Sequence, residues 1–234
     1  EEQSSGDVER LDLAAADIFI RALRVSAVSR ISLATHEQPI VVTAERSGCY
    51  TKYPKFSEYP SDEPKYAVVI DPLDGANNAD AGVSVGSIFG VYELNEASTR
   101  EGTGHVLRAG KELVAAGYAM YGASTLFVMS MGHGAHGFTL DSLGEFLLTR
   151  PHIRTPLSGR TYSVNVALSG GWEAPIASYV HALAVRTTAP KKTLRYIGTM
   201  VADVHRTLLY GGLFLYPAHR GAQKGKLLLA FEAA

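Results

Sequence analysis

The sequence predicts a layered α/β or α+β fold, because helical and strand patterns alternate along most of its 234 residues. Apolar residues three or four apart indicate helices, and β-branched runs bounded by turns indicate strands. A hydrophobic content of 46% excludes a disordered chain and suffices for one large domain or two small ones. A turn-rich stretch after residue 150 predicts a boundary between a domain of residues 1–150 and a domain of residues 151–234.

The first domain is expected to contain two helices and a series of strands. Residues 1–10 are polar and are expected to be mobile, and residues 11–24 show the apolar spacing of an amphipathic helix. A second helix is expected at residues 111–121, ended by Gly122. Short apolar runs predict strands at residues 31–33, 40–42, 66–70, 82–94, 126–131, 137–140 and 145–149.

The second domain is expected to alternate between helix and strand. Helical patterns lie at residues 174–184 and 200–210, and a further helix begins at residue 226. Short strands are expected at residues 194–196 and 213–216.

Composition excludes several classes of function. The net charge of −1 argues against a nucleic acid as the main partner. No apolar run reaches the ~18 residues of a membrane span, so no membrane association is expected. The single cysteine, Cys49, excludes an intrachain disulfide, and the polar, acidic start does not resemble a signal peptide. A cytoplasmic enzyme or binding protein is therefore expected.

One motif carries chemistry, Asp71-Pro72-Leu73-Asp74-Gly75, at the end of an apolar strand. Two carboxylates around a proline turn can face one point, and the Leu73 carbonyl can add a third oxygen, which suits Mg²⁺ beside a phosphate. Gly75 permits a tight turn, after which the amides of Ala76, Asn77 and Asn78 can meet a phosphate. Asp-Pro and Asp-Gly are also ordinary turn formers, so a plain turn remains an alternative.

Histidines offer weaker signals. His36 could replace a carboxylate as a ligand for Mn²⁺ or Zn²⁺, but a solvated turn histidine is the favoured interpretation. His133 and His136 have a metal-like spacing, yet a glycine-flanked β-hairpin accounts for them better. His205 is expected to be a helix-packing residue near the site.

Nearly the whole chain resembles the fructose-1,6-bisphosphatase family of metal-dependent, lithium-sensitive phosphatases. The stretches that carry the resemblance are residues 71–75, 83–90, 113–119, 200–208 and 213–218. The resemblance implies a layered α/β/α/β/α fold of two domains and a homo-oligomer, a dimer of dimers. It also implies that the chain lacks N-terminal and C-terminal portions of the family's fold.

By this resemblance, functional roles fall on residues throughout the chain. Metal ligands would be Asp71, the Leu73 carbonyl, Asp74 and Glu232. Catalytic roles would fall to Asp74, to Asp12, which assists the attacking water, and to Asp7 on a mobile loop. Substrate contacts would come from Gly75, Ala76, Asn77, Asn165, Arg195, Tyr196, Met200, Tyr216 and Lys226. Without the resemblance, Asp12 reads more simply as part of a polar helix face.

Four departures from the family pattern concern the same site. Thr35 and His36 stand where the family has two glutamates, and Ala76-Asn77 replaces a pair of serines. Leu168 stands in place of a tyrosine, and Leu228 in place of an arginine. Losing one electrostatic catalytic group commonly costs about 10²–10³-fold in rate. These losses fall mainly in the catalytic half of the site.

Two functions therefore stay open. The first is a magnesium-dependent phosphatase, with Mn²⁺ or Zn²⁺ as alternative cofactors, that removes the 1-phosphate of fructose 1,6-bisphosphate or a related sugar bisphosphate. The second is a catalytically impaired relative that binds sugar phosphate or serves as a regulatory or structural subunit.

Overall fold

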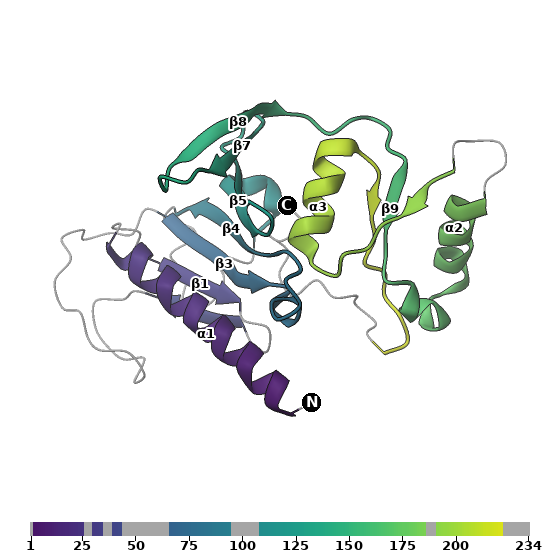
Figure 1. Cartoon of the computed structure of the whole chain (residues 1–234), viewed down its shortest axis with the longest axis horizontal. Coiled ribbons are helices and arrows are strands. Elements are labelled where there is room, and N and C mark those ends of the chain that lie inside the picture. The colour runs from purple at the N-terminus through teal and green to yellow at the C-terminus, as the bar shows by residue number, and fades with distance from the viewer. Residues whose placement is uncertain are drawn as a thin grey trace.

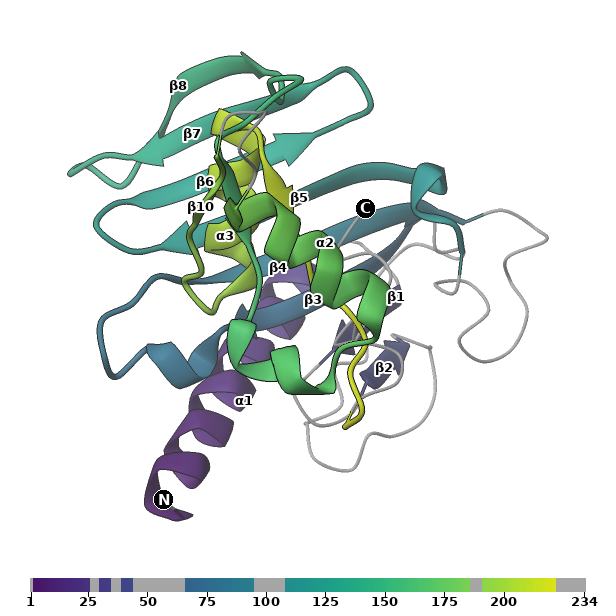
Figure 2. The same ribbon diagram turned by 90° about the vertical axis from the view of Figure 1, so that its right-hand side faces the viewer.

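The computed structural model describes residues 2–25, 30–34, 39–43, 66–94, 108–185 and 191–221. In these ranges three α-helices and two sheets form five layers, in the order helix, sheet, helix, sheet, helix (Figure 1, Figure 2). The expected α/β/α/β/α layering is therefore confirmed. None of the described helices is long and apolar enough to cross a membrane.

The larger sheet has eight strands in the order β2-β1-β3-β4-β5-β6-β7-β8. β1 and β3 are parallel, and every other pair of neighbouring strands in this sheet is antiparallel. The strands are β1 (Arg30–Ala34), β2 (Pro39–Thr43), β3 (Tyr66–Asp74), β4 (Val85–Glu93), β5 (Leu113–Tyr121), β6 (Thr125–Ser130), β7 (Ala135–Leu140) and β8 (Phe146–Ile153).

Helix α1 (Glu2–Val25) covers one face of this sheet (Figure 1). Ala16 and Ile20, one turn apart, pack against Val68 and Ile70 of β3. The helix predicted from residue 11 begins earlier, at Glu2, so it includes most of the polar segment 1–10. Polar residues can belong to a helix whose next two turns are anchored on a sheet, since packing of one apolar face supplies most of its stability.

Helix α3 (Met200–Tyr210) lies on the opposite face and separates the two sheets (Figure 1). Met200 packs against the cluster that Val69, Ile88 and Tyr92 form on that face. The predicted helix at residues 200–210 is thus confirmed to the residue.

The smaller sheet has three parallel strands in the order β10-β9-β11, with α2 (Ala174–Val185) on its outer side (Figure 2). Val180 and Leu183 of α2 pack against Tyr162 and Val164. The strands are β9 (Thr161–Ser163), β10 (Thr193–Leu194) and β11 (Leu213–Phe214). Short 3₁₀ turns complete the chain at η1 (Ala76–Asn78), η4 (Gly110–Glu112) and η5 (Val166–Gly171).

The helix predicted at residues 111–121 is wrong, since this segment forms the short turn η4 and strand β5. Its alanines favour a helix, but β5 pairs on both sides, with β4 and with β6. A Cβ at Gly117 would lie 2.7 Å from Cζ of Phe89, so a glycine here lets the Phe89 ring cross the sheet surface. The three-stranded meander that follows is confirmed, and so is the hairpin at His133 and His136.

Candidate active site

The site begins with an irregularity at the end of β3. Asp71 pairs with Ile88 of β4 and Asp74 pairs with Gly86, so two residues of β3, Pro72 and Leu73, face only Ser87. This is a β-bulge, and a proline fits there because it has no N–H for the ladder. The strand therefore ends at Asp74, and the expectation that it stops before Asp71 is wrong.

Each aspartate of the motif accepts a backbone hydrogen bond. Asp71 Oδ1 accepts from the Leu73 amide at 3.2 Å, and Asp74 Oδ2 accepts from the Val201 amide at 2.7 Å. The second bond joins the end of β3 to the first turn of α3, 127 residues away in the sequence. A carboxylate at this position is favourable because the N-terminal amides of a helix carry a partial positive charge.

Gly75 allows the two segments to approach closely. Its φ of 77° is the left-handed conformation that glycine adopts readily. A Cβ at this position would lie only 2.1 Å from Cγ2 of Thr199, the residue before α3. Asn78 adds a hydrogen bond of 3.4 Å from Nδ2 to the Gly198 carbonyl.

The donor chemistry of this loop suits a hard divalent cation. Asp71, Asp74 and the Leu73 carbonyl are oxygen donors, which Mg²⁺ and Mn²⁺ prefer. Within the part of the chain that the structure describes, no group of three His, Cys, Asp or Glu side chains could hold a metal. Glu232, the third predicted carboxylate, lies outside the described residues.

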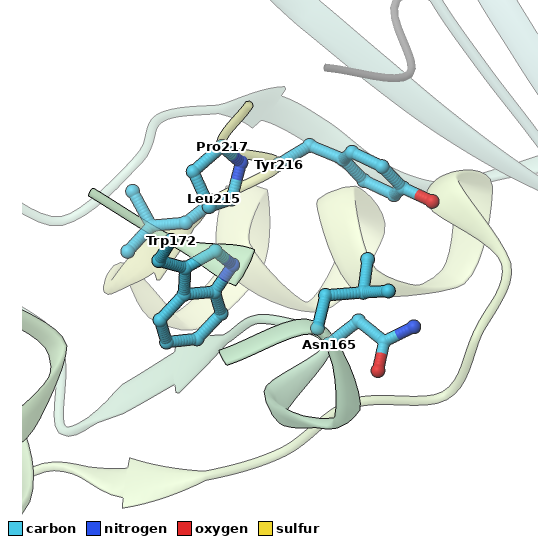
Figure 3. A pocket seen from close by; sticks show the side chains of 6 residues that line it. Asn165, Trp172, Leu215, Tyr216 and Pro217 are labelled. Atoms are coloured by element: carbon cyan, nitrogen blue, oxygen red, sulfur yellow. The ribbon is translucent and has the colours of Figure 1, made fainter. Parts of the chain in front are cut away.

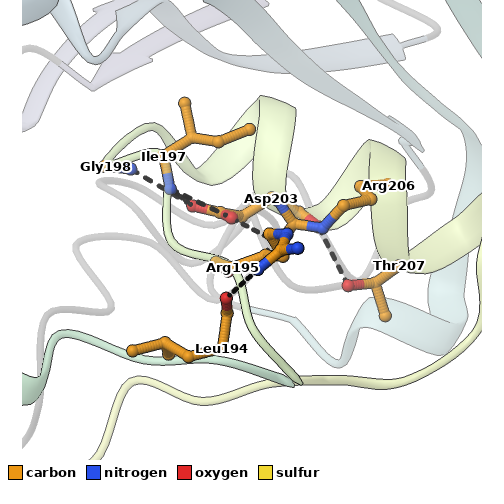
Figure 4. Close-up of polar contacts among 7 residues, drawn as sticks. All are labelled: Leu194, Arg195, Ile197, Gly198, Asp203, Arg206 and Thr207. Carbon is orange, nitrogen blue, oxygen red and sulfur yellow. Dashed lines mark hydrogen bonds and ion pairs between the residues drawn. The ribbon is translucent and has the colours of Figure 1, made fainter. Parts of the chain in front are cut away.

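The loop that precedes α3 is tied to Asp203, a carboxylate with no exposed surface (Figure 4). It accepts hydrogen bonds from the backbone amides of Ile197 and Gly198 at 3.0 and 3.2 Å. Arg206 forms an ion pair with it at 2.6 Å and donates to the Arg195 carbonyl at 2.9 Å. One buried acid thus fixes the backbone that carries Arg195 and Tyr196.

Tyr196 lies near two of the acids described above, Asp203 and Asp74. Burial raises the pKa of Tyr196 most, and the neighbouring Tyr216, Asp203 and Asp74 raise it further. The hydroxyl consequently stays protonated at neutral pH and can donate to a phosphate or sugar oxygen.

A shallow pocket lies beside Tyr216 (Figure 3). The Tyr216 hydroxyl and the Asn165 amide point to one side of it, and Trp172, Leu215 and Pro217 form the other. Asn165 Oδ1 accepts from the Ala167 amide at 3.1 Å, so the NH₂ group can face a ligand. Leu168 lines the same pocket with an apolar side chain.

Other predicted residues fall in different environments. Asp12 is only 6% exposed and precedes Ala16 by one turn on the buried face of α1, so it does not belong to a polar helix face. Asp7 is exposed on the same helix, not on a loop, and pairs with Arg10 at 3.5 Å. Ala76 is buried, whereas Asn77 is exposed. Five predicted residues lie outside the described part of the chain, Thr35, His36, Lys226, Leu228 and Glu232.

The exposed Arg195 side chain turns back toward its own backbone, where Nη1 donates to the Leu194 carbonyl at 2.9 Å (Figure 4). Met200 opens α3 and packs on the larger sheet. The structure thus brings Asp71, Asp74 and Gly75 together with the loop of Tyr196 and with the first turn of α3.

Two contributors to this region carried little signal in the sequence. Asp203 could have been noticed only as the partner of Arg206 three residues later on a helix. Ser87 looks like any strand serine until the bulge places it opposite Pro72. His205 packs as expected, with Nδ1 2.7 Å from the Tyr118 hydroxyl, and burial, helped by Arg150, lowers its pKa.

Comparisons with known proteins cover nearly the whole chain. A family model described as "Fructose-1-6-bisphosphatase, N-terminal domain" matches residues 1–151, and one described as "Fructose-1-6-bisphosphatase, C-terminal domain" matches residues 155–234. Proteins named "Fructose-1,6-bisphosphatase, cytosolic" from Brassica napus and Arabidopsis thaliana are 46% and 47% identical over 226 residues, 96% of this chain.

A solved structure is similar as well. The crystal structure of Leishmania major fructose-1,6-bisphosphatase in holo form has a TM-score of 0.77 and 39% identity, and the match covers 93% of this chain and 65% of that one. The chain spans 62% of the length of the two plant relatives.

Proposed function

Because the chain belongs to the fructose-1,6-bisphosphatase family, we propose that it hydrolyses the 1-phosphate of fructose 1,6-bisphosphate or a related sugar bisphosphate in the cytoplasm. One observation carries this proposal. The 2.7 Å bond from Val201 to Asp74 places a carboxylate-rich loop against the segment that bears Tyr196. The proposed metal ligands and the proposed phosphate donors therefore lie on neighbouring segments.

The two parts of the chain are proposed to bind different parts of the reacting complex. Residues 1–150 would supply the metal ligands Asp71, Asp74 and the Leu73 carbonyl, and residues 151–234 would supply Glu232 and the sugar-phosphate contacts. When bound, a divalent cation such as Mg²⁺ neutralises phosphate charge and lowers the pKa of water. Asp12, buried on α1, is proposed to orient the attacking water.

The substrate contacts act mainly by positioning. Tyr196 and Tyr216 would offer their hydroxyls to the substrate, and the Asn165 amide lines the same pocket as Tyr216. Arg195 and Lys226 would supply positive charge, which phosphate recognition requires. Phosphoryl transfer depends chiefly on such placement and on charge stabilisation.

Ala76 favours a second candidate, a protein that binds sugar phosphate but hydrolyses it poorly. Ala76 is 2% exposed and stands at a position where the resemblance implies a serine hydroxyl. Leu168 likewise lines the pocket without a donor. Binding contacts in the second sheet can survive the loss of such groups, whereas several catalytic losses together can abolish turnover.

Phosphate release from fructose 1,6-bisphosphate, measured across Mg²⁺ and Mn²⁺ concentrations, separates the candidates. Turnover that Asp71→Asn abolishes supports the phosphatase, with Asp141→Asn as a control on the distant β7–β8 turn. If turnover is absent, calorimetry with fructose 6-phosphate decides. Heat of binding supports the sugar-phosphate binder, and its absence contradicts both candidates. We also propose that the protein assembles as a dimer of dimers, which sedimentation velocity tests.

A further inference from the structure

At the β-bulge, a side chain of β4 forms a hydrogen bond with the Pro72 carbonyl. Ser87, the single β4 residue opposite Pro72 and Leu73, is 3% exposed. Its hydroxyl donates to the Pro72 carbonyl at 2.7 Å and lies 2.9 Å from the Tyr121 hydroxyl of β5.

The direction of this chain follows from the proton count. A carbonyl oxygen can only accept, so the one proton of the Ser87 hydroxyl goes to Pro72. Tyr121 must then donate its own proton to Ser87 Oγ. Hydrogen bonds aligned in this way polarise each other, so Tyr121 strengthens the bond that Ser87 makes.

The Pro72 carbonyl and the Leu73 amide belong to one planar peptide group. The Ser87 hydroxyl holds the oxygen of this peptide group. The N–H of the same group, from Leu73, donates to Asp71 Oδ1 at 3.2 Å. Fixing the oxygen therefore fixes the direction of the N–H, and the N–H in turn orients the Asp71 carboxylate.

We infer that Ser87, supported by Tyr121, is a positioning residue that orients the Asp71 carboxylate toward a divalent cation through the Pro72–Leu73 peptide group. The inference rests on the proposed function for the identity of the ligand, and on the hydrogen bonds alone for the positioning. Partners one step removed from a metal commonly contribute about 10–100-fold to its affinity.

Mn²⁺ binding to the full chain, followed by calorimetry and by the electron paramagnetic resonance of free Mn²⁺, tests this. Ser87→Ala should weaken binding by about 10-fold or more. Ser87→Thr, which keeps the hydroxyl, should restore it. Tyr121→Phe, which removes only the supporting donor from a side chain 37% exposed, should have a smaller effect in the same direction.

Ser84→Ala is the matched control, because this serine precedes β4 and its hydroxyl makes no hydrogen bond among the described residues. Mn²⁺ affinity of Ser87→Ala within twofold of wild type, in a folded protein, would overturn the inference. If Ser87→Ala does not fold, the Mn²⁺ affinity of Tyr121→Phe is compared with that of the Ser84→Ala control. Equal affinities would overturn the inference.

Amide hydrogen exchange in metal-free protein separates this inference from the proposed function. Removing the Ser87 hydroxyl should speed exchange at Leu73 by about 10-fold, since its peptide group loses one anchor. If the wild-type chain binds no Mn²⁺, the metal-dependent function fails, while faster exchange still supports the positioning. Whether or not the chain binds Mn²⁺, unchanged exchange at Leu73 would contradict the positioning role of Ser87.

Discussion

The Asp74 carboxylate and the Val201 amide form a 2.7 Å hydrogen bond that joins the last residue of β3 to the first turn of α3. Thr199, the N-cap residue of α3, makes no side-chain capping bond, so an acid from another element takes this role. The same carboxylate is proposed to bind the cation. On this proposal, one side chain serves both catalysis and the junction between β3 and α3.

Asp74→Asn should accordingly lose both properties. We expect a fall of at least about 10²-fold in phosphate release, since a charged group is lost at the reacting phosphate. The free energy of unfolding should fall by about 1 kcal/mol, because a neutral amide caps the helix less well. Phosphate assays and urea titration measure the two effects. Asp80→Asn, an exposed neighbour in the same loop, should change neither.

Gly75→Ala should destabilise the protein by about 3 kcal/mol, from the left-handed backbone and from overpacking. The new methyl group would meet Cγ2 of Thr199 at 2.1 Å. Gly82→Ala is the matched control, since its φ is 67° but nothing lies within 4 Å, and it should cost about 1 kcal/mol. Thr199→Ser should partly rescue the Gly75 variant in urea titrations. Equal costs at the two glycines would contradict the close approach.

Asp203→Asn should lower the free energy of unfolding by about 3 kcal/mol, because it leaves Arg206, 18% exposed, without its charged partner. The backbone at Arg195 and Tyr196 should loosen as well, so the KM for the sugar phosphate should rise more than kcat falls. Asp7→Asn makes the same change in an exposed ion pair and should cost less than about 0.5 kcal/mol. A KM unchanged in the folded Asp203 variant would show that the loop does not depend on this acid.

Stability should decline in mildly acidic solution because of His205. Burial, with a smaller effect of Arg150, lowers its pKa, while the unfolded histidine titrates near about 6.5. Below that pH the unfolded chain binds more protons than the folded one, so the free energy of unfolding falls as the pH falls. The contribution of neutral His205 to the free energy of unfolding is therefore fully present above about pH 6.5. Thermal melts of His205→Gln between pH 8 and pH 5.5 should show a flatter decline than wild type, and parallel curves would contradict the assignment.

Local patterns predicted much of the fold. Helix α3 was predicted to the residue, and the strands of the β6–β8 meander nearly so, because their apolar periodicity agrees with their packing. Strand β5 was mistaken for a helix, since alanine-rich composition favours a helix when no neighbouring strand is considered. The polar start of α1 was missed for the related reason that packing two turns later stabilises it.

The sequence by itself determined the family, the layered fold and the identity of the motif residues, because residue order and spacing carry that information directly. Tertiary structure alone decided that Asp12 faces inward, that Asp203 holds the loop of Tyr196, and that Ser87 faces the Pro72 carbonyl. These relationships join residues from different elements across a bulge or a helix terminus. Such contacts depend on register and on close approach between segments, which no local pattern of residues encodes.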